Sequence, residues 1–305
     1  VENSTPEEIR PFVVKGIEGW NKAFEKAGFK NAIVAKIQPD DAEWDAGDVM
    51  YNVVRWASTP SPRYSGYGPS VANPRTGEII AADIVQEFNA IKRGYTYRKL
   101  WGYTEDNDPL EQWIVSLTMH EVGHTLGLRH NFKSSWIFDA EEIHDVSVTG
   151  NNHIGSVMDY DPINLAPEGV QQGNYFPSGP GSYDMWAIEF GYTPNLTDEQ
   201  RENILSKSSQ PEFIFGTDGD AMSSPGVNID PRNLRGDMSN DPITYTSDRI
   251  KTLDAKIAEL PDIYLVDGKT STEFRSVFYS LTSEKGRFLD NVSRLIGGVY
   301  SNRVV

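Results

Sequence analysis

The sequence predicts an α/β protein, and three observations carry this prediction. A long amphipathic helical pattern occupies residues 6–27, four short β-rich runs follow up to residue 86, and a second helical pattern begins at Asp108. A helix followed by several strands is typical of a twisted sheet with a helix packed on it. The chain of 305 residues is long enough for one large domain or for two subdomains with an extension.

The first helix has clear start and stop signals. Thr5 is placed as an N-cap, Pro6 stands at the first helical position, and Glu8 is the acid of a capping box. Gly28 lies where a C-cap glycine is expected, and Pro11 either kinks the helix or marks where its regular part begins. The apolar positions recur at three- and four-residue spacing: Ile9, Phe12, Val13, Ile17, Trp20 and Phe24.

The β-rich runs cover residues 31–37, 49–57, 66–73 and 78–86. The turn sequence Pro74-Arg75-Thr76-Gly77 separates the last two runs. A short turn segment between two β-rich runs predicts a hairpin.

Three residues mark the start of the second helix: Asp108 as N-cap, Pro109 in the first turn and Glu111 as the acid of a capping box. Gly127 interrupts the helical pattern and marks its end. One stripe of this helix carries Trp113, Leu117, His120 and His124. Beyond it the chain is loop-rich, with helices expected at 183–190, 198–206, 242–260 and 271–296. We expect an N-terminal catalytic subdomain over 1–130, a C-terminal subdomain over 131–195 and a helical extension over 196–305.

Composition excludes several classes of partner and chemistry. A formal net charge of −16 repels polyanions, which argues against nucleic acid as a partner. No window approaches 18 consecutive apolar residues, so the sequence predicts no membrane span. The chain has no cysteine, so histidine and carboxylate must supply any metal ligand or proton-transfer group.

Residues 120–130 read HEVGHTLGLRH and match the pattern HExxHxxGxxH at every specified position. His120 and His124 lie one helical turn apart on one face, so both imidazoles can reach one ion. Gly127 can adopt a left-handed conformation that turns the chain and returns His130 as a third ligand. The alternative is that these are ordinary histidines without a metal, hydrogen-bonded in the core or exposed at the surface. The spacing of the motif argues strongly against it.

The predicted chemistry is zinc-assisted hydrolysis of an amide. Three nitrogen ligands leave the fourth zinc position open, as in catalytic sites. Zinc lowers the pKa of water in that position and polarises the substrate carbonyl. Glu121 is placed to take the water proton as general base and to deliver it to the leaving amine.

Together with Ser156-Val157-Met158-Asp159-Tyr160, the motif resembles the metzincin clan of zinc endopeptidases. The stretches VANPRTGEIIAADI, HTLGLRHNF, SVMDYDP and YDMWAIEFGY are similar to the Met-zincin domain of large bacterial metalloproteases. The resemblance implies a twisted, mostly parallel sheet with an antiparallel edge strand, a backing helix, an active-site helix, and a loop-rich and helical C-terminal subdomain. Such domains usually have a strand before the first helix, so we expect it to be missing or reduced to the first few residues.

The same resemblance implies roles for residues outside the zinc motif. Met158 is implied as a hydrophobic floor under the imidazoles. Tyr160 stands where some metzincin families place a tyrosine that binds the zinc or donates to the developing oxyanion, the alternative being a core or rim tyrosine. The run 66–73 resembles the rim strand of the cleft, where an extended peptide adds antiparallel. Gly68, Pro69 and Ser70 are the candidate substrate-binding residues there, although glycine and proline are equally usual on an edge strand without a function.

Other features point less sharply to function. Five aspartates in a loop-rich segment suit a calcium site, with a solvated acidic loop as the alternative: Asp218, Asp220, Asp230, Asp237 and Asp241. His144 and His153 are interpreted as exposed loop histidines, the alternative being that they orient a metal ligand or bind an accessory metal.

The sequence-based hypothesis is a zinc-dependent endopeptidase acting on a peptide or protein substrate. The alternatives are a zinc amidase acting on cell-wall peptides and a catalytically silent, zinc-stabilised binding module. The chain opens VENSTPEE without a methionine, which indicates a mature form or a piece of something longer, and we expect it to be part of a longer polypeptide. The expected location is extracellular, periplasmic or at the cell surface.

Overall fold

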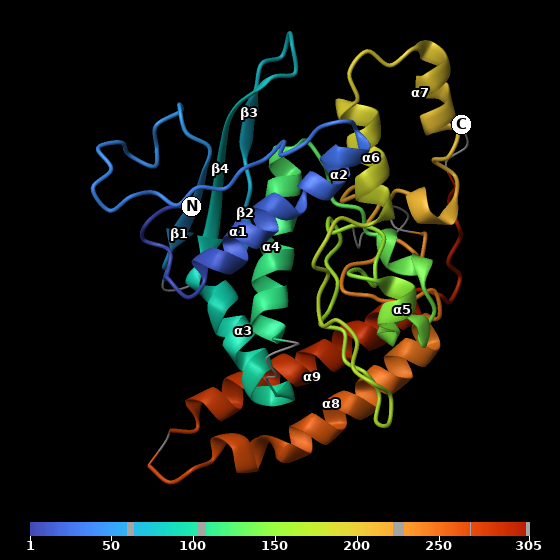
Figure 1. Ribbon diagram of the computed structural model, residues 1–305. Coiled ribbons are helices and arrows are strands. Elements are labelled where there is room, and N and C mark those ends of the chain that lie inside the picture. Colours follow the sequence, from blue (N-terminus) through green and yellow to red (C-terminus); the bar gives the residue numbers. More distant parts are fainter. Residues whose placement is uncertain (60–63, 103–107, 222–228, 269, 303–305) are drawn as a thin grey trace.

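A computed structural model describes residues 1–59, 64–102, 108–221, 229–268 and 270–302, and it confirms the α/β fold class. The N-terminal elements are α1 (Arg10–Gly19), α2 (Asn21–Lys26), β1 (Val53–Ala57), β2 (Gly66–Tyr67), β3 (Ser70–Ala72), β4 (Ile79–Glu87), α3 (Phe88–Trp101) and α4 (Pro109–Thr125). The C-terminal helices are α5 (Val146–Thr149), α6 (Ser182–Tyr192), α7 (Asp198–Leu205), α8 (Pro242–Tyr264) and α9 (Thr272–Ser293), with short 3-10 turns at Ser134–Ile137, Glu142–His144 and Pro211–Phe213. In Figure 1 the sheet and α1 lie beside α4, and α8 and α9 form a long pair across the base.

β4 is the central strand of the sheet. β1 pairs with it in parallel, and β2 and β3 pair with it antiparallel. The expected antiparallel edge is therefore present, and it is made of two short strands. Before β1, the backbone N–H of Glu2 donates to the Val54 carbonyl over 2.9 Å, so the first residues of the chain lie against this strand.

The predicted hairpin turn at 74–77 is confirmed, and it joins the antiparallel strands β3 and β4. The backbone N–H of Asn73 donates to the Glu78 carbonyl over 2.8 Å, and the N–H of Gly77 donates back to the Asn73 carbonyl over 2.8 Å. The run 66–73 is not one strand, because Gly68 and Pro69 separate β2 from β3. Proline removes a ladder donor, which is the physical reason for an interruption there.

The strand predicted over 31–37 is wrong. The backbone of this segment is bonded to helix side chains instead of to a neighbouring strand. Asn21 donates to the Ile33 carbonyl over 2.7 Å and accepts from the Ile33 N–H over 3.0 Å, and Glu18 accepts from the Ala35 N–H over 3.1 Å. Side-chain amides and carboxylates can satisfy main-chain groups in this way without a sheet. The strand predicted over 49–57 begins only at Val53.

The helix predicted over 6–27 is two helices, and its predicted Thr5 cap is wrong. α1 begins at Arg10 with Pro11 in its first turn, so Pro11 marks the regular part of the helix. Trp20 separates α1 from α2 while keeping helical dihedral angles. Its buried indole donates to the Met119 carbonyl over 3.0 Å, which ties this junction to α4.

α3 was not predicted from the sequence, and it packs against α4, as α1 does. α4 therefore runs through the main hydrophobic core, where Ile114, Val115 and Met119 are fully buried. Such a buried position makes α4 a rigid support for the side chains at its C-terminal end.

The predicted C-terminal helices are confirmed, and α8 packs along α9. Arg249 of α8 is fully buried and its guanidinium pairs with Glu284 of α9. Leu253, Leu260, Leu281 and Phe288 form the apolar seam between these helices. In the described part of the chain, no helix combines the length and the apolar character needed to cross a bilayer.

Candidate metal centre

α4 carries the first two candidate ligands and is anchored at both ends. Asp108 caps it as predicted, accepting a hydrogen bond from the Leu110 N–H over 2.9 Å, and Arg98 pairs with the same carboxylate over 2.7 Å. His120 and His124 follow in the last two turns of α4, with Glu121 beside them.

The turn that returns His130 to α4 has the predicted left-handed glycine. Gly127 adopts φ +92°, a region that side chains disfavour. The N–H of Leu128 donates to the Gly123 carbonyl over 3.0 Å, which closes the turn after the helix. Tyr192 of α6 donates its hydroxyl to the Leu126 carbonyl over 2.9 Å, so the turn is also held from outside.

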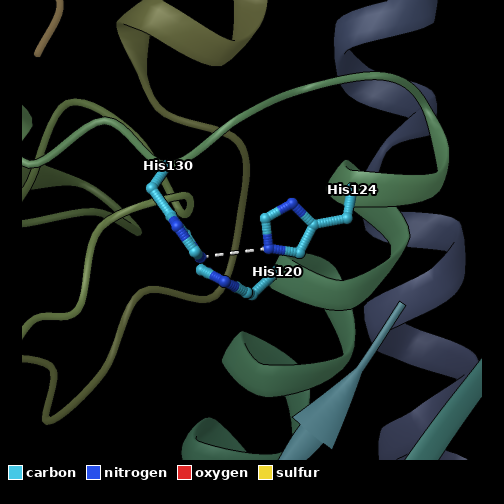
Figure 2. Close-up of side chains that lie close together, drawn as sticks. All are labelled: His120, His124 and His130. Carbon is cyan, nitrogen blue, oxygen red and sulfur yellow. Dashed lines mark hydrogen bonds between the residues drawn. The ribbon is translucent and has the colours of Figure 1, made fainter. Parts of the chain in front are cut away.

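The three histidines converge as the motif predicts. One nitrogen from each of His120, His124 and His130 lies within 4.8 Å of the others, and His124 Nε2 is 3.2 Å from His130 Nε2. Figure 2 shows the three rings directed toward one point from α4 and from the turn that follows it. Among the described residues, these three form the one group of histidines and carboxylates that is gathered closely enough to hold a metal ion.

The second nitrogen of each ring has a hydrogen-bond acceptor. His120 Nδ1 lies 2.7 Å from the Val157 carbonyl, His124 Nδ1 lies 3.0 Å from the Leu128 carbonyl, and His130 Nδ1 lies 2.8 Å from Asp218 Oδ2. An acceptor at Nδ1 fixes the proton there and leaves the Nε2 lone pair free for a metal. The site therefore fits one cation bound by three neutral imidazoles.

The electrostatic environment also favours neutral imidazoles. Burial lowers the pKa of His120 to about 3, with a further contribution from His124 and His130. Burial likewise lowers the pKa of His124. Metal ligation requires deprotonated histidine, so these rings are in the ligating form at neutral pH.

Asp218 lies beside His130, although the sequence places it in a candidate calcium site. Arg235 pairs with its other oxygen over 3.0 Å and stacks over the Phe132 ring. Burial acts to raise the pKa of Asp218, but the hydrogen bond to His130 and the charge of Arg235 outweigh it, so this pKa is lowered. Asp218 is therefore an ionised acceptor that orients the third ring.

The structure does not support the calcium site, because each of the five aspartates is hydrogen-bonded or ion-paired to different partners. Apart from Asp218, Asp220 accepts from the Thr217 N–H, Asp230 pairs with Lys133 and Arg232, Asp237 accepts from Ser135 and Trp136, and Asp241 caps α8 through the Thr244 N–H. A calcium site needs six to eight oxygen ligands around one point, and these carboxylates already serve other donors.

We expect Asp218→Ala to raise the dissociation constant for zinc about 10- to 100-fold, the usual range for loss of a group that orients a metal-bound histidine. Competition against a chromophoric chelator measures this constant. Asp220→Asn, which alters a carboxylate bonded to the Thr217 backbone, is the matched control. Equal zinc affinity in Asp218→Ala and the parent protein would show that the bond to His130 has no such role.

Met158 is fully buried and lies against α4 between the two helical ligands. A Cβ atom added to Gly123 would lie only 2.3 Å from Met158 Sδ and 2.9 Å from the Trp20 ring. The absence of a side chain at Gly123 therefore allows Met158 to pack directly against α4. The implied role of Met158 as a floor under the imidazoles remains a prediction that this packing favours.

Asp184 of α6 holds the turn that contains Met158, and sequence reasoning missed it. Its fully buried carboxylate accepts hydrogen bonds from Ser156 Oγ over 2.6 Å, from the Val157 N–H over 2.9 Å and from the Gly181 N–H over 2.8 Å. The Val157 carbonyl in turn is the acceptor for His120. The orientation of the first ligand therefore depends on a residue of α6.

Glu121 and Tyr160 flank the histidines. Burial raises the pKa of Glu121 to about 8, and a cation held beside it would favour the ionised form. The Tyr160 ring centroid lies 4.6 Å from that of His130 and 5.4 Å from that of His120, and the residue is 44% exposed. Burial, and next the nearby Glu121, raise the pKa of Tyr160 to about 12, which keeps its hydroxyl a donor.

The candidate substrate-binding residues lie at the β2–β3 edge. Gly68 is buried against the backbone of Glu121, Pro69 uses its carbonyl to accept from the Asp83 N–H over 3.2 Å, and Ser70 is exposed in β3. Only β4 pairs with β3 among the described strands. Their role in binding substrate therefore remains a prediction.

His144 and His153 do not join the metal group. Both are buried, contrary to the interpretation as exposed loop residues. Burial, and next His153, lower the pKa of His144 to about 4. His153 Nε2 lies 3.4 Å from Asp161 Oδ2. The residues next to them, Ile143 and Ile154, pack in the apolar cluster that includes α8 and α9.

Comparison with known proteins adds one finding. No curated protein and no solved structure matches the chain. The sequence model of the Met-zincin family matches residues 103–305, which include α4, the three histidines, Met158 and the α8–α9 pair. This match spans more than half of the chain and agrees with the converging histidines and the α/β fold. The chain belongs to the Met-zincin family.

Proposed function

We propose that the protein is a zinc-dependent endopeptidase with Glu121 as general base. The observation that carries this proposal is the convergence of one nitrogen from each of three imidazoles, each ring bonded through Nδ1, beside a buried glutamate on the helix that carries two of them. A merely structural zinc site would be closed by a fourth protein ligand, and no fourth histidine or carboxylate joins the group in the described residues.

The residues divide the chemistry among them. Zinc, when bound by His120, His124 and His130, supplies Lewis-acid polarisation and lowers the pKa of water. Glu121 accepts the proton of the attacking water and returns it to the leaving amine. Tyr160 donates a hydrogen bond to the oxygen that becomes negative in the transition state.

The substrate is proposed to be an extended peptide that adds to the β3 edge, with Gly68, Pro69 and Ser70 along its path. The family resemblance supports this arrangement, as it supports a location outside the cytoplasm or at the cell surface. Ser70 and Val71 are exposed on this edge, so main-chain groups and side chains of β3 are open to a partner strand.

Metal removal followed by substrate profiling tests the proposal. A peptide library and a panel of small cell-wall peptide amides are offered to the purified protein before chelation, after chelation and after one equivalent of zinc is restored. We expect internal cleavage of peptides that disappears with the chelator and returns with zinc. Cleavage of the small amides alone would identify an amidase instead. Stable zinc binding without turnover of either panel would identify a silent binding module.

A further inference from the structure

The backbone of β2 lies in direct contact with Glu121. A Cβ atom added to Gly66 would be 2.4 Å from Glu121 Oε1, 2.8 Å from Cδ and 2.9 Å from Cγ. A Cβ atom added to Gly68 would be 2.4 Å from the Glu121 backbone oxygen and 3.0 Å from its carbonyl carbon. Carbon atoms in contact are normally about 3.5–4.0 Å from their neighbours, so neither position has room for a side chain.

The requirement for glycine is one of space and not of backbone conformation. Neither Gly66 nor Gly68 is among the residues with positive φ, so alanine can adopt their backbone angles. The two positions differ in what they contact, because Gly66 faces the side chain of Glu121 and Gly68 faces mainly its backbone.

β2 is also held in place from the other side. Gly66 pairs with Gln86 of β4, and the Glu87 N–H donates to the Ser65 carbonyl over 2.9 Å. The buried amide of Gln86 donates to Thr118 Oγ1 over 2.7 Å, which joins β4 to α4 one turn before Glu121. The distance between β2 and α4 is thus fixed, and β2 cannot retreat from an added side chain.

We propose that Gly66 is a positioning residue for the reaction. Because glycine has no side chain, the Glu121 carboxylate can occupy the space beside β2 that a Cβ atom at position 66 would fill. The proposal rests on the proposed function for its catalytic meaning. The contact itself is independent of activity. A methyl group at position 66 displaces the carboxylate, whereas a methyl group at position 68 displaces the backbone of α4.

The first test is kinetic. We expect Gly66→Ala to lower kcat about 10- to 100-fold, because small misplacements of a catalytic group have effects of this size. KM and the zinc content of one ion per chain should stay as in the parent protein. Gly286→Ala is the control, since a Cβ atom on this α9 glycine meets nothing within 4 Å. An unchanged kcat in Gly66→Ala would overturn the proposal.

The second test uses thermal unfolding and needs no substrate. Gly66→Ala should lower Tm in the parent protein but not in a Glu121→Ala background, because that change removes Oε1, Cδ and Cγ. Gly68→Ala should lower Tm in both backgrounds, since its two closest contacts are with backbone atoms, which remain when the Oε2 contact at 3.1 Å is removed. If Gly66→Ala does not fold by itself, the double variant must still fold.

The two tests separate failure of this inference from failure of the proposed function. Equal destabilisation by Gly66→Ala with and without the Glu121 side chain would show that the glycine serves only the strand, which overturns the inference. If the parent protein cleaves no peptide but the Tm effect depends on Glu121, the contact is established and the endopeptidase assignment fails.

Discussion

Glu121→Gln should lower kcat/KM for peptide hydrolysis by about a thousandfold while leaving bound zinc at one ion per chain. Loss of a positioned general base typically removes about 10²- to 10⁴-fold of rate. Glutamine keeps the shape of the side chain in its close contact with Gly66 but cannot accept the proton. The three histidines keep their Nδ1 partners, so their affinity for zinc has no reason to fall.

Steady-state kinetics on the best peptide of a library, together with metal analysis, checks this result. Glu111→Gln is the matched control, because Glu111 lies near the start of α4 and pairs with Lys15 at the surface. We expect this control to retain parental kcat/KM. A Glu121→Gln protein that cleaves peptides at the parental rate would remove Glu121 from the mechanism.

Asp184→Ala should lower the free energy of unfolding by about 3 kcal/mol or more. The change leaves the buried Ser156 hydroxyl and the Val157 and Gly181 N–H groups without their acceptor. Each unsatisfied buried donor costs about 1–3 kcal/mol. The turn that carries Met158 also loses its link to α6, so we expect weaker zinc binding through the His120–Val157 hydrogen bond.

Urea denaturation of the metal-free protein measures the stability change. Asp198→Asn is a suitable control because Asp198 is an exposed acid in the first turn of α7, another helix start. The interpretation of Asp184 as the anchor of the methionine turn would be wrong if Asp184→Ala lost less than about 1 kcal/mol, the value of one ordinary hydrogen bond.

The metal ligands were predictable because their geometry is local. His120 and His124 share one helical face, and Gly127 supplies the bend that brings His130 back within six residues. Helix periodicity and glycine stereochemistry are enough to predict this arrangement. All the residues that bring the three ligands together lie within the eleven residues 120–130.

The groups that support the ligands were not predictable in the same way. Asp218 is 88 residues from His130, and Asp184 is 28 residues from Ser156. Their contacts depend on how distant loops and helices pack, which no local pattern encodes. The acidic composition around Asp218 suggested calcium instead, because a count of carboxylates does not reveal which donors they face.

The errors in secondary structure have similar causes. The run 31–37 has β propensity, but Asn21 and Glu18 satisfy its backbone. β propensity reports fit to a pleated surface and not pairing itself. α3 begins directly after β4, with no residue between them. The sequence therefore contains no turn signal that would separate this helix from the strand.

The contact between Asp218 and His130 has a consequence for biogenesis. A chain that ends before residue 218 contains all three ligands but not the acceptor that orients the last of them. Because ribosomal synthesis proceeds from the N-terminus, the three ligands emerge before the acceptor that orients the last of them, which follows 88 residues later. Zinc binding with all three rings oriented therefore has to wait until the segment that carries Asp218 has folded against His130.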